Sequence, residues 1–308
     1  MQTLSKAIKN HSWITFGIKI SLFLIITWVF YYQFISADLN FEVISELNII
    51  SGIIAVLFMP LNWFCEYKKW KVTVNTVSDN IESKNIHNAF LAGIVSGMLT
   101  PNMLGNFVGR IFYFNRKYRV DLIILTTLSN FSQFVWSIVF GLIGIAIINF
   151  ETQKEFIWIS LLIIVFLIAF FFFFDRYLMF IPYFKKWVKR FTEFNLSRAL
   201  KMQFLFWSCF RHLVFSVQFM FVLNFFNQEI SFTLMFWIWQ VYFWVTLSPS
   251  LFLGKIVIRE SISVWVLSAA GLNPTIVVLS SLSIWILNLF IPTILSLIFC
   301  KPPIGSSL

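Results

Sequence analysis

Charge is scarce in this sequence of 308 residues, and long polar segments are missing. Charged residues make up 12% of the chain and hydrophobic residues 59%, with 40 Phe and 13 Trp. A soluble domain has too little polar surface at this composition to cover its exterior. The composition therefore excludes a soluble protein and leaves no room for a separate catalytic domain. It predicts an all-α polytopic membrane helical bundle, with residues 1–308 forming a single transmembrane domain.

Several motifs of catalysis are also missing. The sequence has no Walker motif, no GxGxxG, no HExxH and no acidic metal cluster, so we expect no ATP hydrolysis, no metal and no cofactor. Its three cysteines, Cys65, Cys209 and Cys300, are unclustered and lie in or beside apolar segments, which predicts free buried thiols. The net charge of +10 is explained by the loop charges of membrane proteins, so nucleic acid is not an expected partner.

Apolar stretches long enough for spanning helices recur along the chain. A span needs about 20 mainly apolar residues. The predicted spans are 13–35, 47–65, 122–149, 156–174, 202–226, 232–248, 256–272 and 275–299.

The connections between these spans fall into two groups by charge. Connections 36–46, 150–155 and 227–231 hold acidic residues and only one basic residue, Lys154, whereas the others carry most of the Lys and Arg. Positive residues mark the cytoplasmic side of a membrane protein. We therefore predict a multi-pass protein of the plasma (inner) membrane with both termini in the cytoplasm.

A short motif occurs twice. Residues 100–110 read Thr-Pro-Asn-Met-Leu-Gly-Asn-Phe-Val-Gly-Arg, and residues 248–260 read Ser-Pro-Ser-Leu-Phe-Leu-Gly-Lys-Ile-Val-Ile-Arg-Glu. In each, a glycine is followed five residues later by an arginine, and these pairs are Gly105 with Arg110 and Gly254 with Arg259. Paired interruptions of apolar segments point to a transport site, because non-helical backbone at membrane depth must be buried or line a cavity. We expect Arg110 and Arg259 to face one water-filled cavity. The alternative is two helix-ending turns followed by cytoplasmic charge.

The first motif lies in an apolar stretch, 88–114, that resembles a span. A single crossing there would place Arg116 and Lys117 on the opposite side from Lys68 and Lys69. A re-entrant segment that breaks near Pro101 keeps these basic residues on one side, since proline cannot continue a helical hydrogen-bond ladder. The second motif predicts an interrupted segment near 246–262.

Two charged residues, one just after a predicted span and one inside a span, are candidates for function. Glu66 follows the second span within a basic cluster, and either forms an ion pair with Lys69 or Arg110 or is solvated. Arg211 lies near the middle of a span, where an unpaired arginine costs about 2.5–3.5 kcal/mol. It either binds a lipid phosphate through its guanidinium fork or is neutralised by a buried acid such as Glu260. Its neighbour His212 is predicted to be a structural hydrogen-bonding residue.

The second motif ends in a charged group. Its two cations and one acid leave a surplus positive charge, which suits a phosphate headgroup. The predicted headgroup-binding residues are Arg110, Arg211, Lys255 and Arg259. The predicted supporting residues are Glu66, Lys69, Glu260, Pro101, Gly105, Pro249 and Gly254. Neutral residues that either add donors or pack helices are Asn130, Gln133, Gln218 and Gln240.

These motifs resemble the lysylphosphatidylglycerol synthase transmembrane-region family of flippase-like membrane proteins. The resemblance rests on Asn62-Trp63-x-x-Glu66-x-x-Lys69-Trp70-Lys71, on the stretch from Thr100 to Arg110, and on Pro249 through Arg259. It implies a helical domain with re-entrant segments and a cavity for a lipid. The family's pattern often has an acid after the first motif's glycine, where this chain has Asn106. We expect no soluble synthase domain here, so lipid lysylation by this chain alone is not expected.

Three functions remain open from the sequence. The first is a lipid translocase or lipid-binding transporter for an anionic or lipid-linked headgroup, not driven by ATP through its own chain. The second is a membrane-embedded transferase on a lipid-linked substrate, for which Glu66 and Glu260 are the available acids. The third is a non-catalytic partner of a separate lipid-modifying enzyme, with loop 175–201 as its docking surface. A membrane lipid is the expected ligand in each case.

Overall fold

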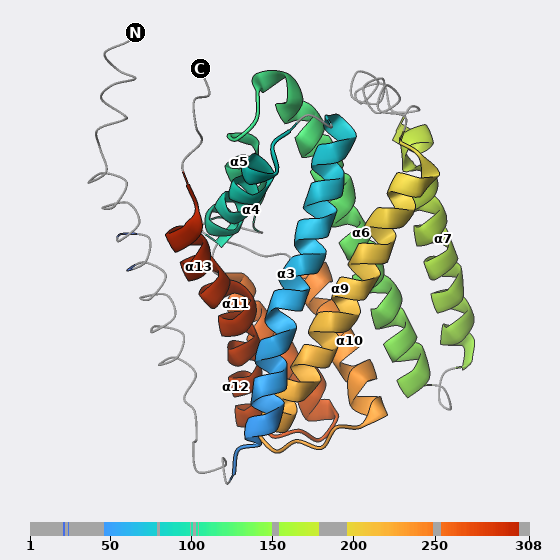
Figure 1. Ribbon diagram of the computed structural model, residues 1–308. Coiled ribbons are helices and arrows are strands. Elements are labelled where there is room, and N and C mark those ends of the chain that lie inside the picture. Colours follow the sequence, from blue (N-terminus) through green and yellow to red (C-terminus); the bar gives the residue numbers. More distant parts are fainter. Residues whose placement is uncertain are drawn as a thin grey trace.

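The computed structural model describes residues 46–78, 81–98, 105–149, 154–178, 196–248 and 254–301, with a few isolated positions besides. Every secondary-structure element in these ranges is helical, which confirms the all-α prediction. Figure 1 shows the helices packed side by side as a bundle. The predicted first span, 13–35, lies almost entirely outside the described residues.

Five of the described helices are long and apolar enough to cross a membrane. They are α3 (Ile49–Val77), α6 (Arg116–Ile148), α7 (Lys154–Leu178), α9 (Arg198–Phe225) and the continuous helical stretch Pro274–Phe299. With its 29 residues, α3 is about 43 Å long, more than the roughly 30 Å of a bilayer core. The helix is therefore longer than a single crossing of the bilayer core requires.

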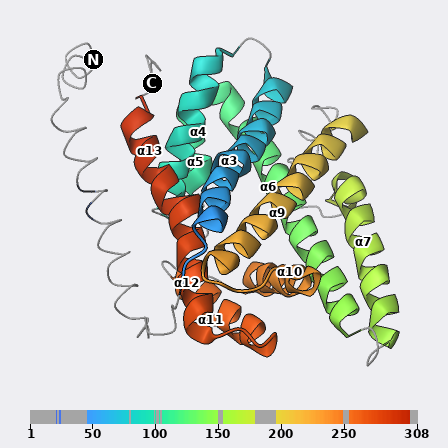
Figure 2. The same cartoon turned by 60° about the horizontal axis from the view of Figure 1, so that its bottom comes forward.

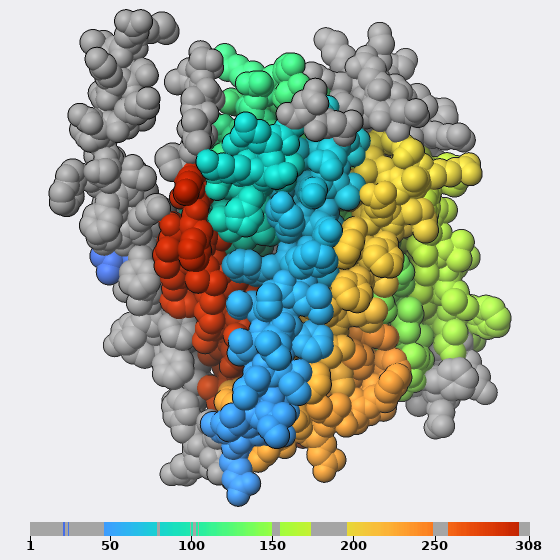
Figure 3. Space-filling model, in the orientation of Figure 1, coloured from blue at the N-terminus to red at the C-terminus, as the bar shows by residue number. Residues whose placement is uncertain are grey.

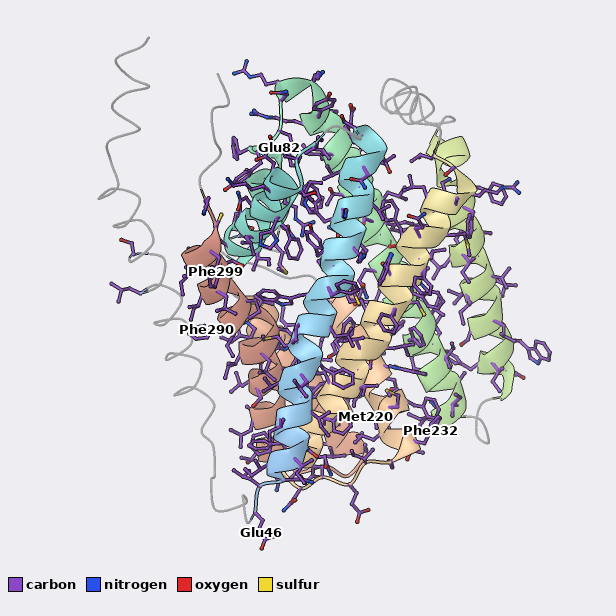
Figure 4. All side chains as sticks on the ribbon, in the orientation of Figure 1. Glu46, Glu82, Met220, Phe232, Phe290 and Phe299 are labelled. Atoms are coloured by element: carbon purple, nitrogen blue, oxygen red, sulfur yellow. The ribbon has the colours of Figure 1, made fainter. Side chains whose placement is uncertain are left out.

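The start of α3 is fastened to the end of α9. The Asn48 amide N–H donates to the Phe225 carbonyl at 2.9 Å, and the Asn48 side chain donates to Asn224 Oδ1 at 3.0 Å. The two helices are therefore antiparallel neighbours, and Figure 3 shows α3 in blue beside α9 in yellow. In Figure 4, Glu46 and Phe232 mark this end of the bundle and Glu82 marks the other.

The segment predicted to be re-entrant is a hairpin of two short helices. These are α4 (Ser83–Met98) and α5 (Gly105–Ile111), and both ends of the hairpin lie beside Trp70. The Trp70 indole donates to the Ile86 carbonyl at 3.0 Å, and its ring contacts Phe114 edge to face. The chain therefore enters and leaves at the end of the bundle where α3 terminates, as predicted. Pro101, the predicted break, lies outside the described residues.

Close backbone approach holds this hairpin together. A side chain at Gly105 would collide with the Ser96 carbonyl oxygen, and one at Gly109 would lie 2.6 Å from the Ala92 carbonyl oxygen. The Gly105 amide donates to Thr100 Oγ1 at 2.5 Å, which gives α5 a polar N-terminal contact. Only glycine fits at the two contact positions, so the glycines of the first motif have a packing role.

Helices α10 (Phe232–Leu247) and α11 (Gly254–Ala269) form a second hairpin at the opposite end. Each has 16 residues, about 24 Å, which is shorter than the bilayer core. The start of α10 and the residues after α11 line one cleft, with Leu234, Trp237 and Leu272 on its walls. The predicted spans 232–248 and 256–272 lie on these two helices, and the number of crossings that they make stays a prediction. Figure 2, which brings this end forward, shows α11 beside α12, whereas α10 packs against α6 and α11.

The last helical stretch contains a local change of helix type. It runs as α12 (Pro274–Trp285), a π-helical turn η4 (Ile286–Phe290) and α13 (Ile291–Phe299). Its end packs against the first hairpin, where the Tyr113 hydroxyl donates to the Lys301 carbonyl and contacts Cys300 Sγ at 3.2 Å. Burial raises the pKa of Tyr113, and the contact with Cys300 adds to the rise. A π-helical turn inside a helix often marks a functional site.

Candidate functional site

Glu66 of α3 is the centre of a buried cluster of charges. Its carboxylate lies 2.9 Å from Arg211 Nη1, 3.3 Å from Arg110 Nη2 and 3.6 Å from Lys69 Nζ. The three cations come from α9, from α5 of the first hairpin and from α3 itself. The sequence predicted pairing with Lys69 or Arg110, and both contacts are present.

Arg110 is held in place by aromatic rings. Its guanidinium lies 4.9 Å from the ring centre of Trp70 and 5.3 Å from that of Phe90, and 2% of the residue is exposed. Cation–π contacts of this kind are stronger when the cation is desolvated. The neighbouring backbone is Gly93, where a Cβ atom would lie 2.6 Å from Arg110 Cγ. The hairpin therefore supplies a fixed cation rather than a mobile one.

Arg211 is the accessible cation of the cluster. Its side chain is 29% exposed, whereas those of Lys69 and Arg110 are 1% and 3% exposed. Its Nε donates to Asn62 Oδ1 at 2.9 Å, so two acceptors on α3 orient the guanidinium. A ligand that approaches the cluster therefore meets Arg211 first.

A chain of side-chain amides continues from Arg211 into the bundle. Asn62 donates to Asn288 Oδ1 at 2.9 Å, and Asn288 donates to Gln218 Oε1 at 2.7 Å. Gln218 then donates to the Ala55 carbonyl at 2.9 Å. Every member donates in the same direction, away from the cation, and such chains polarise one another in a low-dielectric interior.

The π-helical turn places Asn288 in this chain. Because Asn288 belongs to η4, its local helical geometry differs from that of α12 before it and α13 after it. Nothing in the apolar stretch 275–299 signalled this residue beyond its being an amide among apolar neighbours. The sequence predicts Gln218 to be a donor or a packing residue, and in the structure its Oε1 accepts a hydrogen bond from Asn288.

The cluster has unfilled donors. Three cations around one carboxylate leave an excess of two positive charges. Within the described part of the chain, Lys69 Nζ and Arg110 Nε are buried and have no hydrogen-bond acceptor. Buried charged donors are normally paired, because leaving them unpaired is costly. The arrangement is therefore suited to bind an anion.

The second motif forms a different contact. Arg259 of α11 donates to Ser281 Oγ at 3.1 Å, to the Ser281 carbonyl at 3.0 Å and to Glu260 Oε1 at 2.6 Å. Glu260 thus pairs with the residue before it, and the predicted neutralisation of Arg211 by Glu260 is wrong. Glu66 takes that role because α3, not α11, presents an acid to Arg211.

Among the described residues, Arg110 and Arg259 share no contact partner. Arg110 lies in the Glu66 cluster, and Arg259 lies against α12. Gly254 begins α11, while Pro249 and the Lys255 side chain lie outside the described part of the structure. Their predicted roles stay predictions.

The remaining polar residues have mainly packing roles. His212 is fully buried and stacks on Phe140, with ring centres 4.6 Å apart, and no hydrogen-bond partner of its ring nitrogens is found among the described residues. The prediction of a hydrogen-bonding histidine is therefore not met. Among the described residues, the side-chain amide of Gln133 and the amide nitrogen of Gln240 are buried without hydrogen-bond partners. Neither residue contacts Glu66. The three cysteines are free, as predicted, but only Cys65 is buried, whereas Cys209 and Cys300 are half-buried.

Together these features define a helical membrane protein with two opposed hairpins and a buried cationic cluster. The chain belongs to the family described as the lysylphosphatidylglycerol synthase TM region, whose model matches residues 14–296. No curated protein and no solved structure matches the chain significantly. The resemblance proposed from Asn62–Lys71 and the two motifs is thereby confirmed.

Proposed function

We propose that this protein binds the headgroup of an anionic or lipid-linked membrane lipid and moves the lipid between leaflets. The observation that carries the proposal is the position of Arg211. It is partly exposed, oriented by Glu66 and Asn62, and backed by two buried cations. Arg binds phosphate oxygens through its planar fork, and an ionisable residue within a span is a functional candidate by default.

Two opposed hairpins support movement between leaflets rather than binding alone. The α4–α5 hairpin enters from the end where α3 terminates, and the α10–α11 hairpin enters from the other end (Figures 1 and 2). In many transporters, interrupted helices in two halves of the chain frame a site near the middle of the bilayer. The first hairpin contributes Arg110 to the Glu66 cluster.

A membrane-embedded transferase is less well supported. A general base needs a carboxylate that is free to take a proton from a substrate. Both oxygens of Glu66 accept hydrogen bonds, from Arg110 and Arg211. Glu260 is held by Arg259 through Oε1, and its Oε2 is buried without a partner among the described residues. We therefore propose no chemical step for this chain. A separate lipid-modifying enzyme remains a candidate partner.

We also propose an orientation of the protein in the membrane. Arg116, Arg198 and Lys301 belong to helix ends that meet at one end of the bundle, which we assign to the cytoplasm. Lys68 and Lys69 lie in the part of α3 nearest this end. The termini of α9 and α3 that carry Asn224 and Asn48 then face the other side of the plasma membrane. The Glu66 cluster lies nearer the cytoplasmic leaflet, where an anionic headgroup would enter.

Reconstitution tests the function. The purified protein is placed in liposomes that contain a fluorescent anionic phospholipid, and loss of outer-leaflet fluorescence after a quencher is added measures movement. We expect faster movement with the protein than without it, a partial loss in Arg211→Lys and a larger loss in Arg211→Gln. Arg198→Gln is the matched control, because Arg198 is exposed at the start of the same helix. Equal rates for Arg211→Gln and Arg198→Gln would refute the proposal.

A further inference from the structure

The net charge of the Glu66 cluster indicates the charge that its ligand should carry. Its four members hold three positive charges and one negative charge, and three of them are less than 15% exposed. An excess of two charges in a buried site is unfavourable unless a ligand compensates it. A ligand with a single negative charge would leave one of the two charges uncompensated.

Packing holds two of the three cations, Arg110 and Lys69, inside the cluster. Arg110 is fixed between Trp70 and Phe90, and Lys69 is among the largest fully buried side chains of the described residues. Glu66 already contacts all three cations. Lys69 Nζ and Arg110 Nε each keep an unfilled donor position, so the cluster holds open donors that only another acceptor would satisfy.

We propose that the lipid bound here carries a dianionic phosphate, as a phosphate monoester or a diphosphate, rather than a phosphodiester. This inference rests on the proposed function and adds the substrate class to it. A phosphate monoester carries about −1.5 to −2 charges at pH 7, because its second pKa is about 6. It matches the excess of two, and its three terminal oxygens suit several cationic donors at once. Arg211 supplies the direct contact, and Lys69 and Arg110 supply the second unit of charge.

Binding to lipid nanodiscs tests this class. The protein is assembled in zwitterionic phosphatidylcholine discs, and a short-chain phosphatidic acid, with a monoester, is titrated against a short-chain phosphatidylglycerol, with a diester. Inorganic phosphate alone forms a third titration. We expect phosphatidic acid to bind at least about tenfold more tightly than phosphatidylglycerol at pH 7.5. The preference should shrink at pH 5.5, where the monoester is largely a monoanion.

A charge variant gives an independent readout. Lys69→Met removes one cation without touching Arg211, so the preference for the monoester should fall several-fold while binding of the diester persists. Lys68→Met is the matched control, because Lys68 lies over the Phe64 ring and takes no part in the cluster. A Lys69→Met protein with the wild-type preference would overturn the inference.

The outcomes separate the inference from the proposed function. Equal binding of the two lipids at pH 7.5, reduced in both by Arg211→Gln, would overturn the dianion class and leave the anion site intact. Binding of neither lipid would overturn both. Inorganic phosphate that binds as tightly as phosphatidic acid would show that a free phosphate, not a lipid, is the ligand, and would also overturn the inference.

Discussion

Arg211 of α9 donates a hydrogen bond of 2.9 Å to Glu66 of α3, although the two residues lie 145 positions apart in the sequence. This contact joins two long antiparallel helices at the level where the first hairpin inserts Arg110. A buried ion pair is seldom a net source of stability, but removing one partner leaves an uncompensated charge. The pair therefore makes the cluster sensitive to single substitutions.

Glu66→Gln should destabilise the protein strongly. It leaves three cations without their common carboxylate, and breaking a buried pair costs about 3–5 kcal/mol. The expected result is a clear drop in the melting temperature in mild detergent, followed by tryptophan fluorescence. Glu82→Gln is the matched control, since Glu82 is exposed just before α4. If the Glu66→Gln protein melted at the same temperature as the Glu82→Gln control, the carboxylate of Glu66 would not stabilise the cluster.

Asn288→Leu should weaken both stability and ligand binding. It leaves Asn62 and Gln218 each without one buried partner, at about 1–3 kcal/mol per unsatisfied group. Arg211 then loses the support of the amide chain, so affinity for an anionic lipid should fall as well. Ser283→Ala is the control, because the Ser283 hydroxyl donates to the Leu279 carbonyl of its own helix and to no other helix among the described residues. Unchanged lipid affinity in a stably folded Asn288→Leu protein would show that the chain does not position Arg211.

Gly105→Ala should open the first hairpin. The added methyl group would collide with the Ser96 carbonyl oxygen, and overpacking of this kind costs about 1–3 kcal/mol. Arg110 sits on the displaced helix, so lipid movement should fall together with the melting temperature. Val108→Ala on the same helix is the control, because Val108 is 49% exposed. If Gly105→Ala matched the control in both assays, the close approach of α4 and α5 would be unimportant.

Single cysteines should label from opposite sides of the membrane at the two ends of the bundle. In a cysteine-free background, Lys84→Cys should react only with reagents that reach the cytoplasm, and Glu229→Cys only with impermeant reagents outside. Both positions are exposed and flank opposite hairpins. Labelling of both residues from the same side would refute the assigned topology and the opposed arrangement of the hairpins.

Much of the fold could be predicted because it depends on local properties. Apolar length predicts the long helices, and the segregation of Lys and Arg predicts that 88–114 returns to its own side, as the contacts of Trp70 with Ile86 and Phe114 show. The lengths of α10 and α11 are harder to predict from the sequence. Both stretches are apolar, and the residues around Pro249 do not show how far each helix extends.

The site was only partly predictable because its contacts are between helices. Glu66 and Lys69 are three residues apart on one helix, so periodicity brings them together. The choice of Glu66 rather than Glu260 as the partner of Arg211 depends on which helix packs beside α9. Periodicity does not determine that choice. Asn288 enters the site through a π-helical turn, which has no recognisable signature in the sequence.

The most direct test of the account is an experimental density map of the protein in nanodiscs that contain phosphatidic acid. We predict phosphate density within hydrogen-bonding distance of the Arg211 guanidinium, on the side that faces Lys69 and Arg110, and the loss of this density in Arg211→Gln. Phosphate density bound only at Arg259, or a water-filled Glu66 cluster with no bound phosphate at saturating lipid, would contradict it.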